Sequence, residues 1–146
     1  MSTQFDTFKP KEKMKLTVLL TMLSSTASAL ALDVETYSDS LDFAQVTNVV
    51  ANQKANGRWC FNTSVLHNDQ SWEHYADGWE VLDLDGNRLA FRKLAHPHDN
   101  EQPFTRSLCD IEIANEITEV IVRAKCNTHG YGGKPLRIEL YKDRDA

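Results

Sequence analysis

Residues 79–94 read Trp-Glu-Val-Leu-Asp-Leu-Asp-Gly-Asn-Arg-Leu-Ala-Phe-Arg-Lys-Leu, which is two apolar-rich segments around an Asp-Gly pair. An Asp-Gly pair between such segments is a strong short-range signal for a β-hairpin. We expect strands over Trp79–Leu84 and Arg88–Leu94, joined by the turn Asp83–Asn87. This hairpin indicates an antiparallel sheet.

The rest of the chain after residue 42 repeats this pattern of short segments and turns. In residues 58–66 the alternation places Trp59, Phe61, Thr63 and Val65 on one face. Helical spacing also fits Leu41–Gln53, but its Val and Thr content favours a strand. About seven strands in close succession predict an all-β protein, an immunoglobulin- or fibronectin-III-like antiparallel β-sandwich. The five further expected strands are 43–51, 58–66, Phe104–Ile113, Glu119–Cys126 and Pro135–Tyr141.

The connections between these strands alternate between short and long. In a series of antiparallel strands, every second connection lies at the same end of the sandwich. The long connections, which we expect to meet at one end, are His67–Gly78, His96–Pro103 and the Gly-rich Asn127–Lys134. The short turns at the other end are Gln53–Gly57, Asp83–Asn87 and Ala114–Thr118. Loops carried by a rigid sandwich are a common place for function.

All five histidines of the chain fall in the long connections. Neutral imidazole is the commonest metal ligand in proteins, and carboxylates complete many such sites. We expect a Zn(II) or Cu(II) site with His74 and His129 as first ligands, His96 or His98 as the third, and Glu101 as a fourth ligand or orienting partner. Pro97 fixes an extended backbone, so the rings of His96 and His98 are expected to point in opposite directions.

Aromatic side chains beside the histidines suggest an alternative function. Trp72, Tyr75 and Tyr131 combine an apolar body with a polar group, which suits a protein-facing patch. A metal-free protein-interaction or envelope-associated module is therefore the first alternative to metal binding, and a metal-dependent hydrolase is the second. Cys126 and His129 have the spacing of a nucleophile and base but lack a supporting motif, and the familiar catalytic motifs are absent. We therefore predict a binding module rather than an enzyme, with no catalytic residues.

The three cysteines leave the disulfide pairing open. The N-terminal sequence predicts export to an oxidising compartment, where three cysteines are expected to form one disulfide and leave one free thiol. Cys126 is in phase with the apolar residues of its strand, Cys109 is in phase with Ile111 and Ile113, and Cys60 is out of phase with its apolar neighbours. We keep two pairings, Cys109–Cys126 and Cys60–Cys126, together with the alternative of three buried free thiols.

The N-terminal residues have the order of a secretory signal peptide. Lysines precede the apolar stretch 16–23, and small residues follow it with two cleavage frames, Ala27-Ser28-Ala29 and Ala29-Leu30-Ala31. We expect a signal peptide over 1–31, with 1–13 as an upstream extension, and one domain over 32–146. The apolar stretch is too short to span a membrane, which takes about 20 residues. The protein is therefore expected to be extracytoplasmic, either periplasmic or secreted.

Charge and composition exclude several classes of partner. The chain has 146 residues, a formal net charge of −5 and a hydrophobic fraction of 41%. An acidic chain is poorly suited to nucleic acid or an anionic membrane surface, since both attract basic proteins. We expect a metal ion or a protein as partner, with no transmembrane segment.

Three segments also resemble a known group of sequences. They are Trp72–Trp79 (Trp-Glu-His-Tyr-Ala-Asp-Gly-Trp), residues 96–108 (His-Pro-His-Asp-Asn-Glu-Gln-Pro-Phe-Thr-Arg-Ser-Leu), and Val122-Arg-Ala together with His129-Gly-Tyr-Gly-Gly133. In these segments the chain resembles a family of small exported proteobacterial proteins of unknown function. The resemblance implies an extracytoplasmic bacterial protein and no particular activity.

Overall fold

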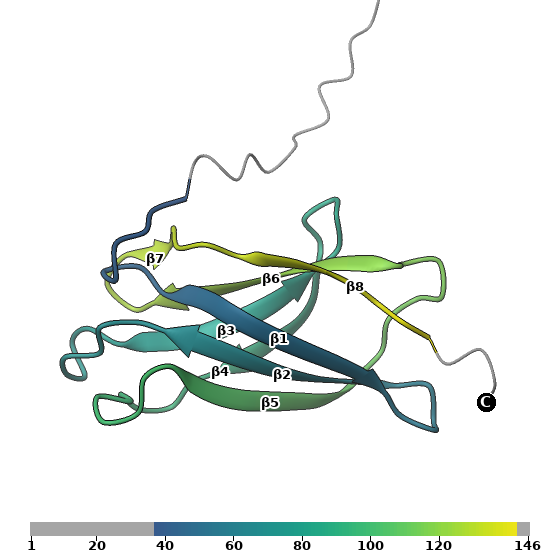
Figure 1. The fold of residues 1–146 in the computed structure, drawn as a ribbon, viewed down its shortest axis with the longest axis horizontal. Coiled ribbons are helices and arrows are strands. Elements are labelled where there is room, and N and C mark those ends of the chain that lie inside the picture. Colours follow the sequence, from purple (N-terminus) through teal and green to yellow (C-terminus); the bar gives the residue numbers. More distant parts are fainter. Residues whose placement is uncertain (1–36, 143–146) are drawn as a thin grey trace, which may run out of the picture. The chain divides into compact units, whose positions relative to one another are not determined.

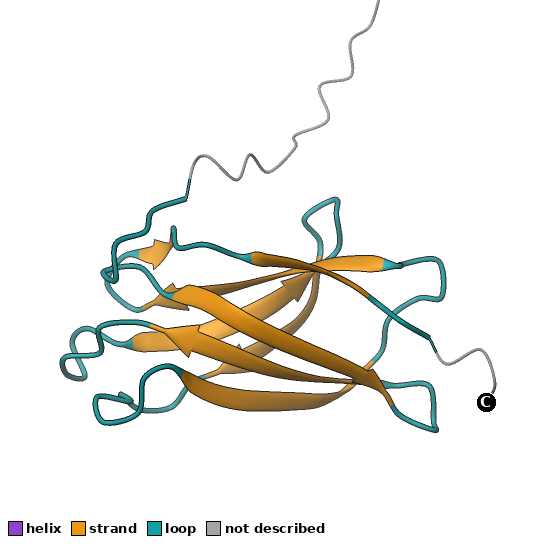
Figure 2. Cartoon of the chain, viewed as in Figure 1, coloured by secondary structure: helices purple, strands orange, loops and turns teal. Residues whose placement is uncertain are grey.

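The structure is a computed structural model that describes residues 37–142, all within the unit Leu32–Ala146. The expected signal peptide lies outside the described residues. Figure 2 shows that the described chain consists of strands and connections without a helix. Two antiparallel sheets face each other, so the expected β-sandwich is confirmed (Figure 1).

Eight strands form the two sheets. The three-stranded sheet has the order β1-β2-β5, and the five-stranded sheet has the order β4-β3-β6-β7, with β8 also paired to β6. The strands are β1 (Gln45–Gln53), β2 (Trp59–Leu66), β3 (Ala76–Leu82), β4 (Arg88–Lys93), β5 (Phe104–Ile111), β6 (Glu119–Cys126), β7 (Gly130–Tyr131) and β8 (Leu136–Glu139).

The strand order is that of an immunoglobulin-type sandwich. Strands β1, β2 and β5 share one sheet and β3, β6 and β8 the other, as strands A, B, E and C, F, G do in immunoglobulin domains. The fourth strand, β4, pairs with β3 and forms the edge of the second sheet. The expected hairpin at residues 79–94 is thus the β3–β4 pair, although β3 begins at Ala76 rather than Trp79.

Sequence alternation correctly identified the buried face of β2. Trp59, Phe61, Thr63 and Val65 of β2 are all fully buried. The segment with helical spacing forms strand β1, as its composition indicated. The core between the sheets is completed by β3 and β6, whose inward residues include Trp79, Val81, Val120, Val122 and Ala124.

The disulfide joins Cys60 to Cys109, so both pairings expected from the sequence were wrong. The cause is a β-bulge: Trp59 pairs with Ile111 but Phe61 pairs with Leu108, which leaves one extra residue on β5. Asp110 takes a positive φ of 60° at this point. The bulge reverses the alternation of β5, so Cys109 lies on the outer face beside Cys60 rather than in phase with Ile111.

Cys126 is therefore the free cysteine, and it is fully buried. It is in phase with the inward residues of β6, as expected, but it stands at the end of the strand. This position brings its thiol to the end of the sandwich where the long connections lie.

The long connections do meet at one end. Figure 1 places the β2–β3, β4–β5 and β6–β7 connections together, opposite the β1–β2 and β3–β4 turns. Hydrogen bonds join them: Asp69 of the first accepts from the main chain of His98 in the second, and Asn127 of the third contacts Tyr75 in the first. Antiparallel connectivity was sufficient to predict this.

Candidate metal centre

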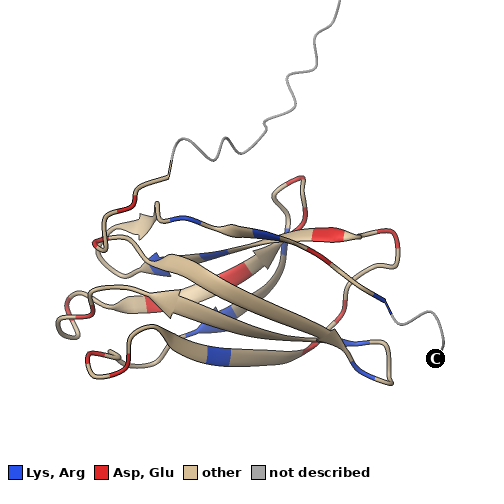
Figure 3. Ribbon diagram, in the orientation of Figure 1, with Lys and Arg blue, Asp and Glu red and all other residues tan. Residues whose placement is uncertain are grey.

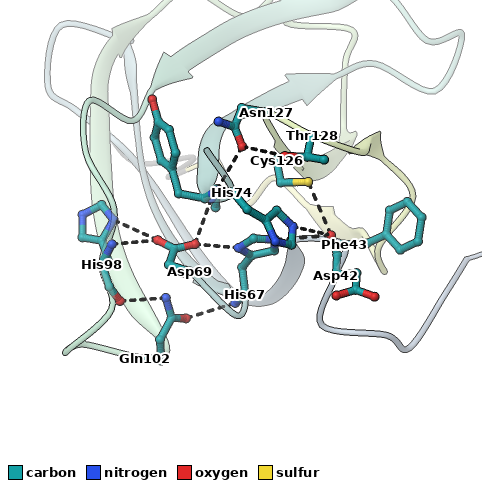
Figure 4. A network of polar contacts seen from close by, with 12 residues as sticks. Asp42, Phe43, His67, Asp69, His74, His98, Gln102, Cys126, Asn127 and Thr128 are labelled. Carbon is teal, nitrogen blue, oxygen red and sulfur yellow. Dashed lines mark hydrogen bonds and ion pairs between the residues drawn. The ribbon is translucent and has the colours of Figure 1, made fainter. Parts of the chain in front are cut away.

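Polar side chains from separate parts of the chain converge at this end of the sandwich. His67 and His74 lie in the β2–β3 connection, Cys126 ends β6, and His129 lies in the turn before β7. The segment before β1 contributes the main-chain carbonyl of Asp42. Figure 4 shows the labelled side chains of His67, His74 and Cys126 directed toward that carbonyl.

A buried glutamine holds the segment that carries this carbonyl. The side-chain Nε2 of Gln45 donates to the carbonyl oxygens of Ser38, Ser40 and Phe43 at 2.9, 3.0 and 3.1 Å. Its Oε1 accepts from the main-chain N of Lys134 at 2.8 Å. The segment 38–45 is thereby folded into a fixed loop and joined to the β7–β8 connection.

Two glycines let this segment lie directly against the β7–β8 connection. A Cβ on Gly132 would overlap the ring of Phe43, and a Cβ on Gly133 would overlap the carbonyl oxygen of Ala44. The main-chain N of Ser38 donates to the carbonyl of Gly132 at 2.8 Å. These glycines therefore serve close packing beside the site.

The Asp42 carbonyl oxygen is the common neighbour of the site. It lies 3.3 Å from His67 Nε2, 3.4 Å from His74 Nε2 and 3.0 Å from His129 Nδ1. Cys126 Sγ is 3.4 Å from the same oxygen and 3.6 Å from His129 Nδ1. The rings of His67 and His74 have centroids 4.8 Å apart, and those of His74 and His129 lie 4.9 Å apart.

These contacts exceed what one oxygen can accept. A carbonyl oxygen has two lone pairs, whereas three ring nitrogens and a thiol surround this one. At least two of the four groups therefore face it without a good hydrogen bond. Such an excess of nitrogen and sulfur atoms around a small space is what a cation site offers.

Asp69 fixes the orientation of His67 through Nδ1, the ring nitrogen that is directed away from the Asp42 carbonyl. The fully buried carboxylate accepts from His67 Nδ1 at 2.6 Å, from the main-chain N of Ala76 at 2.9 Å and from that of His98 at 2.7 Å. Burial raises the pKa of Asp69, but hydrogen bonds from His67 and from the two main-chain amides outweigh it and hold the pKa below its ordinary value. Asp69 is thus an ionised acceptor at neutral pH.

This contact determines the tautomer of His67. Since Asp69 is an acceptor, the His67 Nδ1 carries a proton, and the neutral ring has a bare lone pair on Nε2. That lone pair faces the Asp42 carbonyl oxygen, which is also an acceptor. A histidine held through Nδ1 by a carboxylate, with Nε2 free, is the usual arrangement of a metal-binding histidine.

His96 and His98 do not join this group. The His98 ring stacks on Phe104 with centroids 3.9 Å apart, and among the described residues neither of its ring nitrogens has a hydrogen-bond partner. The His96 and His98 rings lie 4.5 Å apart, so the expected opposite orientation was wrong. Burial lowers the pKa of His98, and the charges of Arg106 and His96 lower it further.

Glu101 is also separate from the cluster. Its carboxylate accepts from Arg106 at 3.2 Å on the exposed side of the β4–β5 connection. The structure therefore brings together His74 and His129 from the expected ligands and leaves His96, His98 and Glu101 apart. Asp69 lies between the two groups, with one oxygen 3.8 Å from His98 Nδ1.

Of the three aromatic residues expected at a binding surface, two lie together and one lies apart. Trp72 and Tyr75 form an edge-to-face pair with centroids 5.8 Å apart, and Trp72 is 66% exposed. Tyr131 instead packs over the guanidinium of Arg123 at 4.1 Å. The surface patch at this end consequently rests on Trp72 and Tyr75.

Sequence reasoning missed three participants: His67, Cys126 and the main chain of Asp42. Two short spacings carried a signal, namely the pair His67 and Asp69 and the Cys-x-x-His of Cys126 and His129. The first spacing suits a histidine that is oriented by a neighbouring carboxylate. The second places a cysteine and a histidine close together where a strand ends. The Asp42 carbonyl had no sequence signal, because any residue supplies one.

Comparison with known proteins gives one distant similarity. The chain is 40% identical over 107 residues to a protein of Halomicrobium mukohataei that is named "Putative lipoprotein". The match covers 72% of this chain and 52% of that protein, so the chain spans about half the length of the relative it matches. No family model matches the chain, and no solved structure matches it.

Proposed function

We propose that this protein is an exported binding module that holds a divalent transition-metal ion among its long connections. The observation that supports it is the convergence of His67, His74, His129 and Cys126 on the Asp42 carbonyl. Three of these side chains offer ligand atoms within 4.8 Å of one another, namely His67, His74 and Cys126. Imidazole and thiolate together suit Zn(II) and copper better than Mg(II) or Ca(II).

The cellular location is part of the same proposal. The N-terminal order of basic, apolar and small residues is typical of export, and the similar Halomicrobium protein carries a lipoprotein name. Within residues 37–142 no helix is long and apolar enough to cross a membrane. An extracytoplasmic, envelope-associated or secreted module fits these observations.

Metal analysis and titration test the proposal. Protein purified without a His tag should bind about one equivalent of Zn(II) or Cu(II), and metal at about 100 times its dissociation constant should add about 2.7 kcal/mol to the free energy of unfolding. The His74→Ala/His129→Ala double variant should lose more than about 100-fold in affinity. The control is His96→Ala, which changes an exposed histidine outside the cluster. Equal affinity in all three proteins would reject the proposal.

One observation favours a metal-free interaction module as a second candidate. Trp72 is the most exposed tryptophan position described, at 66%, and it pairs with Tyr75 on the same surface. Exposed tryptophan and tyrosine are typical of protein interfaces. If metal binding fails, capture of an envelope protein that is lost in Trp72→Ala, with the fold intact by circular dichroism, would support this candidate.

A further inference from the structure

The free cysteine determines which metal chemistry the site offers. Cys126 is buried at the end of β6, and its Sγ accepts from the main-chain N of His129 at 3.1 Å. Its sulfur also lies 3.6 Å from Nδ1 of His129, and cysteine binds metal ions through this sulfur. The disulfide joins the other two cysteines, so the Cys126 thiol remains available to bind a metal ion.

We propose that the ion is copper, bound by the Cys126 thiolate and by Nε2 of His67 and His74, with the Asp42 carbonyl as a weak fourth ligand. This inference rests on the proposed metal-binding function and specifies its metal. Two histidines and one cysteine around a distant axial ligand, which in some proteins is a main-chain oxygen, is the ligand set of copper electron-transfer sites.

The spacing of the donor atoms fits a single first-row ion. Ligands at about 2.0–2.3 Å from an ion are separated by about 3.3–3.6 Å in a tetrahedral arrangement. The carbonyl oxygen lies 3.3 Å from His67 Nε2, 3.4 Å from His74 Nε2 and 3.4 Å from Cys126 Sγ. The ligand atoms of His67, His74 and Cys126 lie within 4.8 Å of one another, so their separations need to shorten by at most about 1.5 Å.

The neighbouring groups favour copper over other metals. The carboxylate of Asp69 does not take part as a ligand, because it contacts Nδ1 of His67, on the other side of the ring from the proposed ligand atom Nε2. Oxygen-preferring ions therefore lack their usual ligands. A structural Zn(II) site would require a fourth protein ligand, and the candidate is His129. Its Nδ1, however, makes the shortest contact to the Asp42 carbonyl at 3.0 Å, which suits a positioning residue for that oxygen.

Copper in such a site would exchange a single electron. Cu(II) would accept one electron from an external one-electron donor and become Cu(I), the donor would lose one electron, and no bond would form or break. The partly exposed His74 and the exposed His129 beside Phe43 give this end of the sandwich a surface through which the electron can pass.

Optical titration tests the metal and the sulfur ligand together. Adding one equivalent of Cu(II) to untagged, metal-free protein should produce an intense visible thiolate-to-copper charge-transfer band. Ascorbate should bleach this band and ferricyanide should restore it. Cys126→Ser should abolish the band, whereas the Cys60→Ser/Cys109→Ser variant should keep it. Copper-edge X-ray absorption of the wild-type protein, which should show one sulfur ligand, supplies the same information if Cys126→Ser does not fold.

The outcomes separate this inference from the function on which it rests. Copper bound without the band and without a sulfur ligand would overturn the inference and leave a histidine metal site. Co(II) and Zn(II) bound tightly by His129 as well as Cys126, with no stable Cu(II) form, would assign a zinc site instead. Failure of every metal to bind would overturn both proposals.

Discussion

Asp69 is the residue on which the arrangement of the site depends most directly. It is buried, and within residues 37–142 it pairs with no arginine or lysine. It orients His67 and anchors the main chains of Ala76 and His98. One carboxylate therefore joins the β2–β3 connection to the β4–β5 connection. A histidine ligand held in this way loses little freedom when it binds an ion.

We expect Asp69→Asn to weaken metal binding by about 10- to 100-fold, because an amide no longer fixes the tautomer of His67. The apoprotein should also lose about 1–3 kcal/mol in its free energy of unfolding, since the amide cannot accept all three hydrogen bonds. Metal titration and urea unfolding measure the two effects. Asp99→Asn, at an exposed position of the β4–β5 connection, is the matched control. Unchanged affinity in Asp69→Asn would contradict the role given to Asp69.

Glu80 forms the second buried acidic centre, on the outer face of the five-stranded sheet. It accepts from Arg88 of β4 at 2.5 Å and from Arg123 of β6 at 2.7 Å. Figure 3 shows the acidic and basic positions along the strands. Burial raises the pKa of Glu80, but hydrogen bonds from Arg123 and Arg88 outweigh it and hold the pKa below the ordinary value of 4.5.

Because this pKa is depressed in the folded state, Glu80 stabilises the protein above its unfolded pKa of 4.5, and the contribution is lost as the pH falls through the folded value. We expect Glu80→Gln to cost about 1–3 kcal/mol at neutral pH and to make the free energy of unfolding less dependent on pH below about 4.5. Urea unfolding at several pH values measures this. Parallel pH profiles for variant and wild type would show that the ion pairs contribute nothing.

At the level of elements, the bulge in β5 determines which two cysteines form the disulfide. It adds one residue between the Phe61–Leu108 and Trp59–Ile111 pairs and turns Cys109 toward Cys60. The bridge joins neighbouring strands of the same sheet, with a sequence separation of 49 residues. The loop that it closes contains β3 and β4 as well.

We expect Cys60→Ser/Cys109→Ser to lower the free energy of unfolding by about 2–4 kcal/mol, mainly because the unfolded chain is no longer restricted by a loop of this length. Denaturant unfolding under oxidising conditions measures the loss. Metal binding should be retained, since neither cysteine is near Cys126. A comparable loss of stability in Cys126→Ser alone, together with a free Cys109 in thiol labelling of the wild type, would contradict this pairing.

The position of the Asp42 carbonyl depends on the close packing of residues 38–45 against the β7–β8 connection. We expect Gly133→Ala to displace Ala44 and with it the Asp42 carbonyl, because the added Cβ would overlap the Ala44 carbonyl oxygen. The cost should be about 1–3 kcal/mol, with weaker metal binding. Gly86→Asn is the control, because that turn position has open space and a φ of 85° that asparagine tolerates. Wild-type affinity in Gly133→Ala would show that the carbonyl position is unimportant.

At the scale of the whole molecule, the sandwich places residues from distant parts of the chain around one point. Asp42 and Cys126 are 84 residues apart in sequence and contact each other in the fold. A rigid sandwich can hold such a site without dedicated secondary structure, because every connection at one end begins and finishes on a fixed strand.

We expect the protein recovered from the periplasm or medium to begin near Leu30 or Leu32, because a signal peptidase cuts after small residues that follow an apolar stretch. Intact-mass measurement of that fraction gives the N-terminus directly. A cytoplasmic sample expressed without export provides the uncut mass for comparison. An exported form that still contains residues 1–29 would reject the signal peptide.

The sequence by itself was sufficient for the fold and for the end of the molecule where the site lies. Alternating residues such as Trp59 to Val65 reveal strand faces, Asp85 and Gly86 reveal a hairpin, and antiparallel connectivity places the long connections together. Each of these properties depends on residues close in sequence or on the simple geometry of consecutive strands. For the same reason His74 and His129 could be chosen correctly as neighbours.

The tertiary structure alone decided the disulfide, the remaining members of the cluster and the separation of His96, His98 and Glu101 from it. The bulge at Asp110 depends on the pairing of β5 with β2, and no local pattern reports a change of phase. The Asp42 carbonyl became central because Gln45 and two glycines hold its segment against a connection some 90 residues away. Local periodicity fixes which face of a strand is buried, whereas the distances between side chains on different loops depend on how those loops pack.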